Sequence, residues 1–138
     1  MTAPASDRAR PRLTAEQKLA IAEQAVLDLR AVSPVVLDMR EVTVITDYFV
    51  ICHGTSNVHV RALADRVLER FEEQRLRPRA EGYREAQWIL LDYGDVVVHI
   101  FAEEQREFYS LERLWSDAPR RDLSPPETVS NERDADQP

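Results

Sequence analysis

The residue types that could carry out chemistry in this chain stand mainly in the stretch Cys52–His59. Gly54-Thr55-Ser56 precedes a helical pattern there, and backbone amides at a helix N-terminus can bind a phosphate group. The three glycines of the chain, however, cannot be combined into a dinucleotide-binding fingerprint or a P-loop. A serine nucleophile elbow would need glycine two places after Ser56, where the chain has Val58. A serine hydrolase is therefore a poor hypothesis.

Imidazole and thiol groups are the other candidates. His53, His59 and His99 together with Cys52 could supply metal ligands, but their spacings match no standard ligand pattern. Cys52 is the single cysteine and stands in an apolar run, where an unreactive core thiol is the ordinary expectation. The sequence therefore predicts no metal site, no catalytic residue and no cofactor.

A strand that ends in Gly-Thr-Ser before a helix also resembles the opening of nucleotidyltransferases. Those enzymes place two carboxylates on a following strand, where they hold divalent metal ions. In this chain the next acids, Asp65 and Glu69, fall inside a helical pattern, and Asp92 and Asp95 flank a turn. The acids are missing from the places that two-metal chemistry needs, so a residual enzyme of this kind stays only as an alternative.

The densest apolar stretch is Gln87–Glu103, which predicts two strands folded back about Tyr93-Gly94-Asp95. Its side chains are largely β-branched or aromatic, and Gly94 supplies the positive φ that a tight hairpin turn needs. Because side chains alternate along a strand, Trp88, Leu90 and Asp92 share one face.

Both faces of this hairpin are mostly apolar, which allows two interpretations. The strands are central and covered on both sides by the chain itself, or one face is left for a partner. Trp88 beside an acidic turn favours the second interpretation, because tryptophan is a frequent interface anchor.

The elements that must position these residues follow from periodicity and capping signals. A capping box at Thr14–Gln17 begins a helix that is predicted to run to about Val32, where Ser33-Pro34 stops it. The other predicted elements are strands 35–39 and 47–52, a helix after Ser56, a weak strand 79–81, and a helix 105–115. This order predicts an α/β domain in which helices pack on a small mixed sheet.

Length and composition predict one domain, residues 14–115, between two tails. Residues 1–13 and the Pro-rich, acidic residues 116–138 lack apolar periodicity and are predicted to be disordered. No stretch has the length of a membrane span or the pattern of a signal peptide, so we expect a cytoplasmic protein.

The net charge of the whole chain is −7, which disfavours a phosphate-rich partner and favours a basic one. An arginine cluster at Arg75, Arg77, Arg79 and Arg84 is interleaved with glutamates, so direct RNA binding, as in a ribosome biogenesis factor, is the second alternative.

Three motifs in order carry a family resemblance: Asp47–Val67 (DYFVICHGTSNVHVRALADRV), Glu81–Phe101 (EGYREAQWILLDYGDVVVHIF) and Phe108–Trp115 (FYSLERLW). The chain thereby resembles the ribosomal silencing factor family, the RsfS or Iojap-like group, over about Leu19–Trp115. The chain departs from the family pattern at His53 and Val58, beside the Gly-Thr-Ser turn.

The resemblance implies a nucleotidyltransferase-like topology without catalysis. It also implies binding to the large ribosomal subunit through its interface protein number fourteen, which blocks subunit association and represses translation under nutrient limitation. A homodimer off the ribosome is implied as well. The partner-binding positions that it indicates are Trp88, Leu90, Asp92, Gly94 and Asp95.

Overall fold

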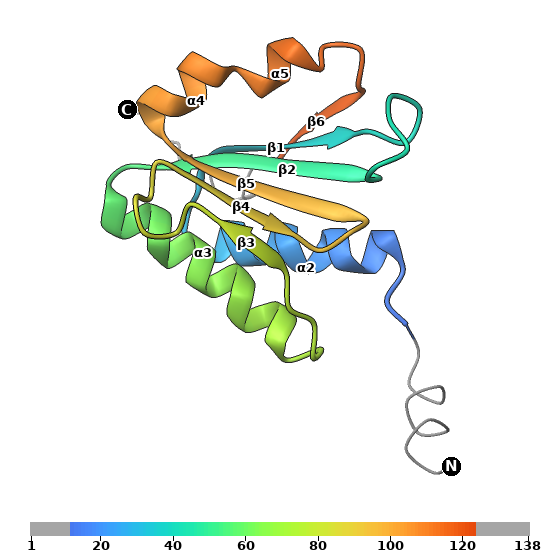
Figure 1. Ribbon diagram of the computed structural model, residues 1–138, viewed down its shortest axis with the longest axis horizontal. Helices are drawn as coiled ribbons and strands as arrows, with labels where there is room; N and C mark the ends of the chain where they lie inside the picture. Colours follow the sequence, from blue (N-terminus) through green and yellow to red (C-terminus); the bar gives the residue numbers. More distant parts are fainter. Residues whose placement is uncertain (1–11, 124–138) are drawn as a thin grey trace, which may run out of the picture.

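The computed structural model describes residues 12–123, which form one mixed sheet with helices on both faces (Figure 1). The strand order is β3-β4-β5-β2-β1-β6, and only β2 and β5 pair in parallel. The strands are β1 (Val32–Asp38), β2 (Tyr48–Gly54), β3 (Arg79–Glu81), β4 (Trp88–Asp92), β5 (Val96–Ala102) and β6 (Arg120–Asp122). The predicted α/β class and the small mixed sheet are confirmed.

The helices cover the two faces unequally. Helices α2 (Ala15–Asp28) and α3 (Asn57–Glu72) lie along one face and enclose the larger apolar core. The shorter α4 (Glu103–Tyr109) and α5 (Leu111–Leu114) lie over the other face and enclose a smaller core. The second face of the sheet is therefore covered by less helix than the first.

The predicted hairpin is present, and its two strands differ in burial. Every residue of β5 from Val96 to Phe101 is buried, as expected of a strand covered on both faces. In β4 only Ile89 and Leu91 are buried, while Trp88, Leu90 and Asp92 are half-buried. The interpretation of a strand covered on both faces thus holds for β5, whereas one face of β4 stays partly exposed and the partner interpretation remains a prediction.

The first predicted helix ends earlier than its sequence pattern suggests. The capping box at Thr14 and Gln17 is present, but α2 stops at Asp28 rather than near Val32. Arg30 adopts a left-handed φ of 58°, and the Ala31 amide donates to the Val26 carbonyl, as in a Schellman helix end. No glycine signals this ending, which is why the prediction missed it.

The predicted final helix is broken in two. Ser110 has a φ of 46°, which separates α4 from α5. Arg106 holds the two pieces together, since its guanidinium donates to the Glu112 carboxylate across the break at 2.6 Å. The sequence prediction of one helix over 105–115 was therefore wrong at its centre.

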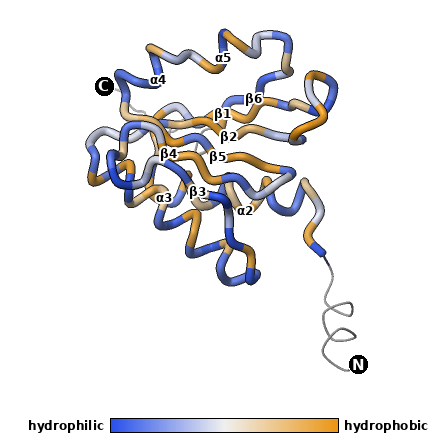
Figure 2. The backbone as a smooth tube through the Cα atoms, in the orientation of Figure 1, coloured by the Kyte–Doolittle hydropathy of each residue, from blue (hydrophilic) through white to orange (hydrophobic). Residues whose placement is uncertain are grey.

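The predicted domain boundary at Trp115 is also wrong. Arg120–Asp122 form β6, which pairs with β1 at the sheet edge, and Leu123 is buried in the larger core. Figure 2 shows why the prediction missed this strand, because β6 is hydrophilic beside the apolar central strands. The remaining parts of the two predicted tails, residues 1–11 and 124–138, lie outside the described residues.

Candidate partner-binding face

The five predicted partner-binding residues lie together on β4 and its turn. Trp88, Leu90 and Asp92 point to the α4 side of the sheet, opposite the core that receives Ile89 and Leu91. These three side chains are half-buried, so a second protein can still contact them. Together with the turn they form what we call the Trp88 face, which consists of Trp88, Leu90, Asp92, Gly94 and Asp95.

Trp88 is held by contacts from β5 and α4. Its indole N–H donates to Nδ1 of His99 at 3.1 Å. The indole ring also lies 4.9 Å from the ring of Phe101 and 4.7 Å from that of Tyr109, centroid to centroid. The side chain is therefore held in one orientation and does not rotate freely on the surface.

The hairpin turn is rigidly built. Gly94 has a φ of 88°, and its amide donates to Oδ1 of Asp92 at 2.8 Å, which closes the turn. Lys18 of α2 donates to the Tyr93 carbonyl at 3.0 Å and to Oδ2 of Asp95 at 3.4 Å. Both aspartates thus shape the turn, and they give the Trp88 face an acidic end.

Neighbouring strands add residues that the sequence prediction did not assign to this face. Strand pairing places Arg79 opposite Asp92 and Glu81 opposite Leu90. It also places His99 opposite Leu90 on the other side of β4. The hairpin register could have predicted His99 from the turn position, whereas nothing in the sequence specifies how β3 pairs.

The loop between β1 and β2 adds an exposed apolar pair next to the hairpin turn. The amides of Asp47 and Tyr48 both donate to the Asp95 carbonyl, at 2.9 and 3.0 Å. Just before them, Val44 is fully exposed at 102% and Ile45 is 81% exposed. Exposed apolar residues beside an acidic turn extend the surface that a partner could cover.

The Gly-Thr-Ser turn has an internal role. The Thr55 amide donates to Nδ1 of His59 at 2.9 Å, and the Ser56 hydroxyl caps α3 by accepting from the His59 amide at 3.1 Å. Nε2 of the same imidazole bonds the Leu29 carbonyl at the end of α2, at 2.8 Å. A Cβ at position 54 would lie 2.9 Å from the Val60 amide nitrogen. The turn therefore joins β2, α3 and α2 tightly.

The other candidates for imidazole or thiol chemistry are also engaged or enclosed. Nδ1 of His53 accepts from Arg106 at 3.0 Å, and burial together with that guanidinium lowers the pKa of His53. Burial raises the pKa of the Cys52 thiol to about 12, so this thiol is unreactive at neutral pH. Within residues 12–123, no group of three or more His, Cys, Asp or Glu could hold a metal ion.

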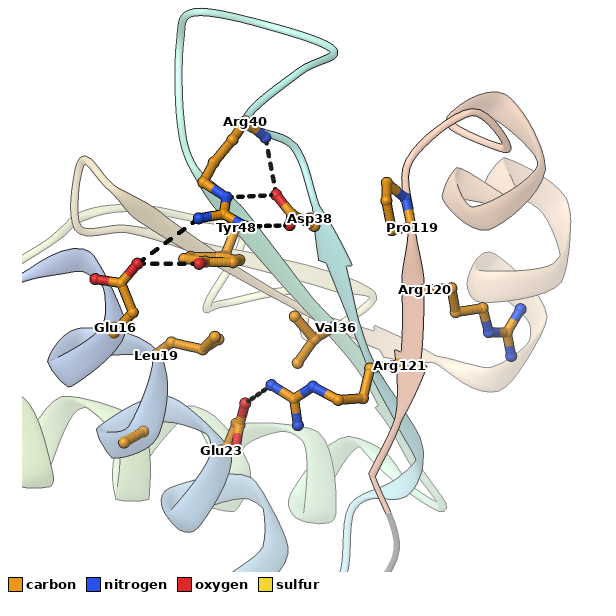
Figure 3. Close-up of a pocket in the computed structure, with 11 residues that line it drawn as sticks. Glu16, Leu19, Glu23, Val36, Asp38, Arg40, Tyr48, Pro119, Arg120 and Arg121 are labelled. Atoms are coloured by element: carbon orange, nitrogen blue, oxygen red, sulfur yellow. Dashed lines mark hydrogen bonds and ion pairs between the residues drawn. The ribbon is translucent and has the colours of Figure 1, made fainter.

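A surface pocket of about 530 Å³ lies between α2, β1 and β6, on the other side of the sheet (Figure 3). Arg40 pairs with Asp38 at 2.7 Å, and Arg121 pairs with Glu23 across the pocket. The Tyr48 hydroxyl donates to a Glu16 oxygen at 3.2 Å. These charged groups pair with one another, and their contacts hold β6 and the loop between β1 and β2 against α2.

Comparison with known proteins identifies the family of the chain. The sequence model described as "Ribosomal silencing factor during starvation" matches residues 12–138. The ribosomal silencing factor RsfS of Bacillus subtilis is 44% identical over 106 residues, which cover 76% of this chain and 90% of that protein. The chain belongs to the ribosomal silencing factor family.

Solved structures agree with this assignment. A Chromobacterium violaceum protein superposes with a TM-score of 0.73 at 30% identity, covering 75% of this chain and 88% of the other. A Bacillus halodurans protein gives a TM-score of 0.70 at 40% identity, covering 78% and 99%. The resemblance to the ribosomal silencing factor family that the three motifs predicted is confirmed.

The two positions at which this chain departs from the family pattern have different surroundings. His53 lies against Arg106 under α4, whereas Val58 is exposed on the first turn of α3. Neither belongs to the Trp88 face. No helix within the described range 12–123 is long and apolar enough to cross a membrane.

Proposed function

We propose that this protein binds the large ribosomal subunit through the basic ribosomal protein numbered fourteen at the subunit interface. Bound there, it prevents the small subunit from joining and represses translation when nutrients are scarce. The observation that carries the proposal is the Trp88 face, where Trp88 is oriented yet partly exposed at the start of β4 and the acidic turn follows the end of the same strand.

The composition of this surface supports a basic protein as the partner. Trp88, Leu90 and the loop residues Val44 and Ile45 offer apolar contact area. Asp92 offers negative charge at the rim, whereas Lys18 partly neutralises Asp95. A stable interface combines an apolar centre with a polar rim, and complementary charge speeds association. Ribosomal proteins are rich in lysine and arginine, which suits a chain with a net charge of −7.

The proposal describes a binding protein of the cytoplasm rather than an enzyme or an RNA-binding protein. The Gly-Thr-Ser turn and both aspartates of the hairpin are engaged in contacts within the chain. In the arginine cluster, Arg77 pairs with Glu72 at 3.2 Å and Arg79 stands opposite Asp92. These contacts support a mixed-charge surface more than a phosphate-binding one.

Anti-association activity is the direct test of this function. The protein is expected to co-sediment with isolated large subunits and not with small subunits. Added before small subunits, it is expected to lower the yield of joined ribosomes in a sucrose gradient. Unchanged joining at saturating protein would overturn the proposal. Labelled nucleoside triphosphates in the same reaction would reveal transfer activity and favour the enzyme alternative.

We also propose that the protein is a homodimer when it is not on the ribosome. The exposed apolar residues Val44, Ile45, Phe108 and Leu114 support this, because exposed apolar surface favours association. Light scattering across the micromolar range is expected to give twice the monomer mass of 15.9 kDa. The monomer mass at all concentrations would contradict the dimer while leaving ribosome binding open.

A further inference from the structure

We propose that His99 is a positioning residue for Trp88 and that it determines which chemistry the ribosomal partner meets at this anchor. The inference rests on the proposed function, because it assigns a role within the same face. It is carried by one hydrogen bond, from the Trp88 indole N–H to Nδ1 of His99 at 3.1 Å, and by the surroundings of that imidazole.

The hydrogen bond defines the state of the histidine. An indole nitrogen can only donate, so Nδ1 of His99 must be the acceptor, and the neutral ring carries its proton on Nε2. His99 is only 4% exposed, and burial lowers its pKa to about 3. The imidazole therefore remains an acceptor for Trp88 over the whole physiological pH range.

The other ring nitrogen of His99, Nε2, lowers the stability of the fold. Nε2 is buried and has no hydrogen-bond partner among the described residues. The ring lies among apolar neighbours, with the Phe49 ring centroid at 4.5 Å. An unpaired buried N–H is unfavourable, and an apolar side chain at this position would avoid that cost. What the histidine provides in return is the acceptor for Trp88.

This arrangement determines what Trp88 presents to a partner. Its only polar atom is directed to His99, so the rest of the indole is carbon surface. Contacts with Phe101 and Tyr109 hold the ring on its other sides. A basic partner is then expected to meet the indole with the aliphatic stem or the cationic group of a lysine or arginine, rather than by accepting from the indole N–H.

Two substitutions separate positioning from bulk. In His99→Asn, the amide oxygen lies near the place of Nδ1 and keeps an acceptor for Trp88. His99→Leu introduces an apolar side chain of similar reach and removes the acceptor. The readouts are the affinity for large subunits and the Trp88 indole N–H resonance, assigned by its loss in Trp88→Phe, with Trp115 as the internal reference.

The two variants are expected to differ in both readouts. His99→Leu should move the Trp88 N–H resonance, speed its exchange with solvent and weaken large-subunit binding by about tenfold, the size of one lost hydrogen bond. His99→Asn should keep the resonance protected and restore most of the affinity. In the unaltered protein, nitrogen shifts of His99 should show an unprotonated Nδ1 from pH 5 to 8, which requires no variant to fold.

Each outcome decides the matter. Equal affinity of the unaltered protein and His99→Leu overturns the inference and leaves the proposed function standing. A protonated Nδ1 in the unaltered protein overturns it as well. Failure of the unaltered protein to bind large subunits overturns the proposed function and the inference together.

Discussion

Replacement of Trp88 by alanine is expected to weaken binding to the large ribosomal subunit by about thirty-fold or more. Truncation of a central aromatic anchor typically reduces the binding free energy by about 2 to 4 kcal/mol, whereas truncation of a peripheral contact reduces it by less than about 1 kcal/mol. Trp88 has the required geometry, because His99, Phe101 and Tyr109 orient it while it stays partly exposed. Affinity measured by titration of labelled protein against purified large subunits checks the expectation.

Stability must be measured on the same variant, because Trp88 also packs on the smaller core. Thermal unfolding is expected to shift, but by less than the loss of ~3 to 5 kcal/mol that is typical when a fully buried tryptophan is truncated. Glu69→Ala on the solvent side of α3 is the control and should bind as the unaltered protein does.

Ile45→Lys tests the same surface at a position where stability is not a concern. Ile45 is 81% exposed, so the change should leave the melting temperature within error. It should weaken binding, because it removes an apolar contact and places a positive charge against a basic partner. If Trp88→Ala and Ile45→Lys both bind normally while remaining folded, the Trp88 face is not the ribosome-binding surface. If Trp88→Ala loses binding only because the domain has unfolded, the test of this face passes to Ile45 and Asp92.

Replacement of Arg106 by methionine is expected to lower the free energy of unfolding by about 3 to 5 kcal/mol, as when one partner of a buried ion pair is removed. Arg106 is buried in α4 and donates to the Glu112 carboxylate at 2.6 and 3.2 Å. It also donates to the Val32 carbonyl at 3.1 Å and to Nδ1 of His53 at 3.0 Å. Its loss leaves a mostly buried carboxylate and two other acceptors without their donor.

Urea unfolding of matched variants shows whether the loss of stability in Arg106→Met comes from the buried ion pair. Arg113→Met, at an exposed arginine of α5, is expected to change stability by less than about 0.5 kcal/mol. The double variant Arg106→Met with Glu112→Leu should recover much of the loss, since it removes the unpaired charge as well. A loss no larger in Arg106→Met than in Arg113→Met would show that the buried pair does not hold the two helices.

The same substitution connects the fold to the candidate site. Helix α4 carries Tyr109, whose ring contacts the Trp88 indole. Loosening α4 is therefore expected to weaken ribosome binding in addition to stability, whereas Arg113→Met should leave both unchanged. Arg106 is thus a structural support of the Trp88 face rather than a part of it.

The sequence by itself determined the features that depend on local contacts. The capping box at Thr14, the cap at Ser56 and the hairpin about Gly94 were all predicted, because each is formed by residues within a few positions of one another. The alternation along Trp88–Asp92 also placed three of the five site residues on one face. The family followed from the same motifs.

Only the tertiary structure decided the features that depend on distant partners. Helix α2 ends and the last helix breaks at left-handed residues, Arg30 and Ser110, that are not glycine and give no sequence signal. Strand β6 is polar and short, and it is defined by its hydrogen bonds to β1, more than eighty positions away.

The tertiary structure also determines which face of β4 stays partly exposed. Two apolar faces look alike in sequence, and they differ here because α2 and α3 are long enough to cover their side completely while α4 and α5 are short. Hydrogen bonds and burial between distant segments have no counterpart in local side-chain periodicity. The position of Tyr109 against Trp88 depends on that long-range packing, whereas the local hairpin register brings His99 to Trp88.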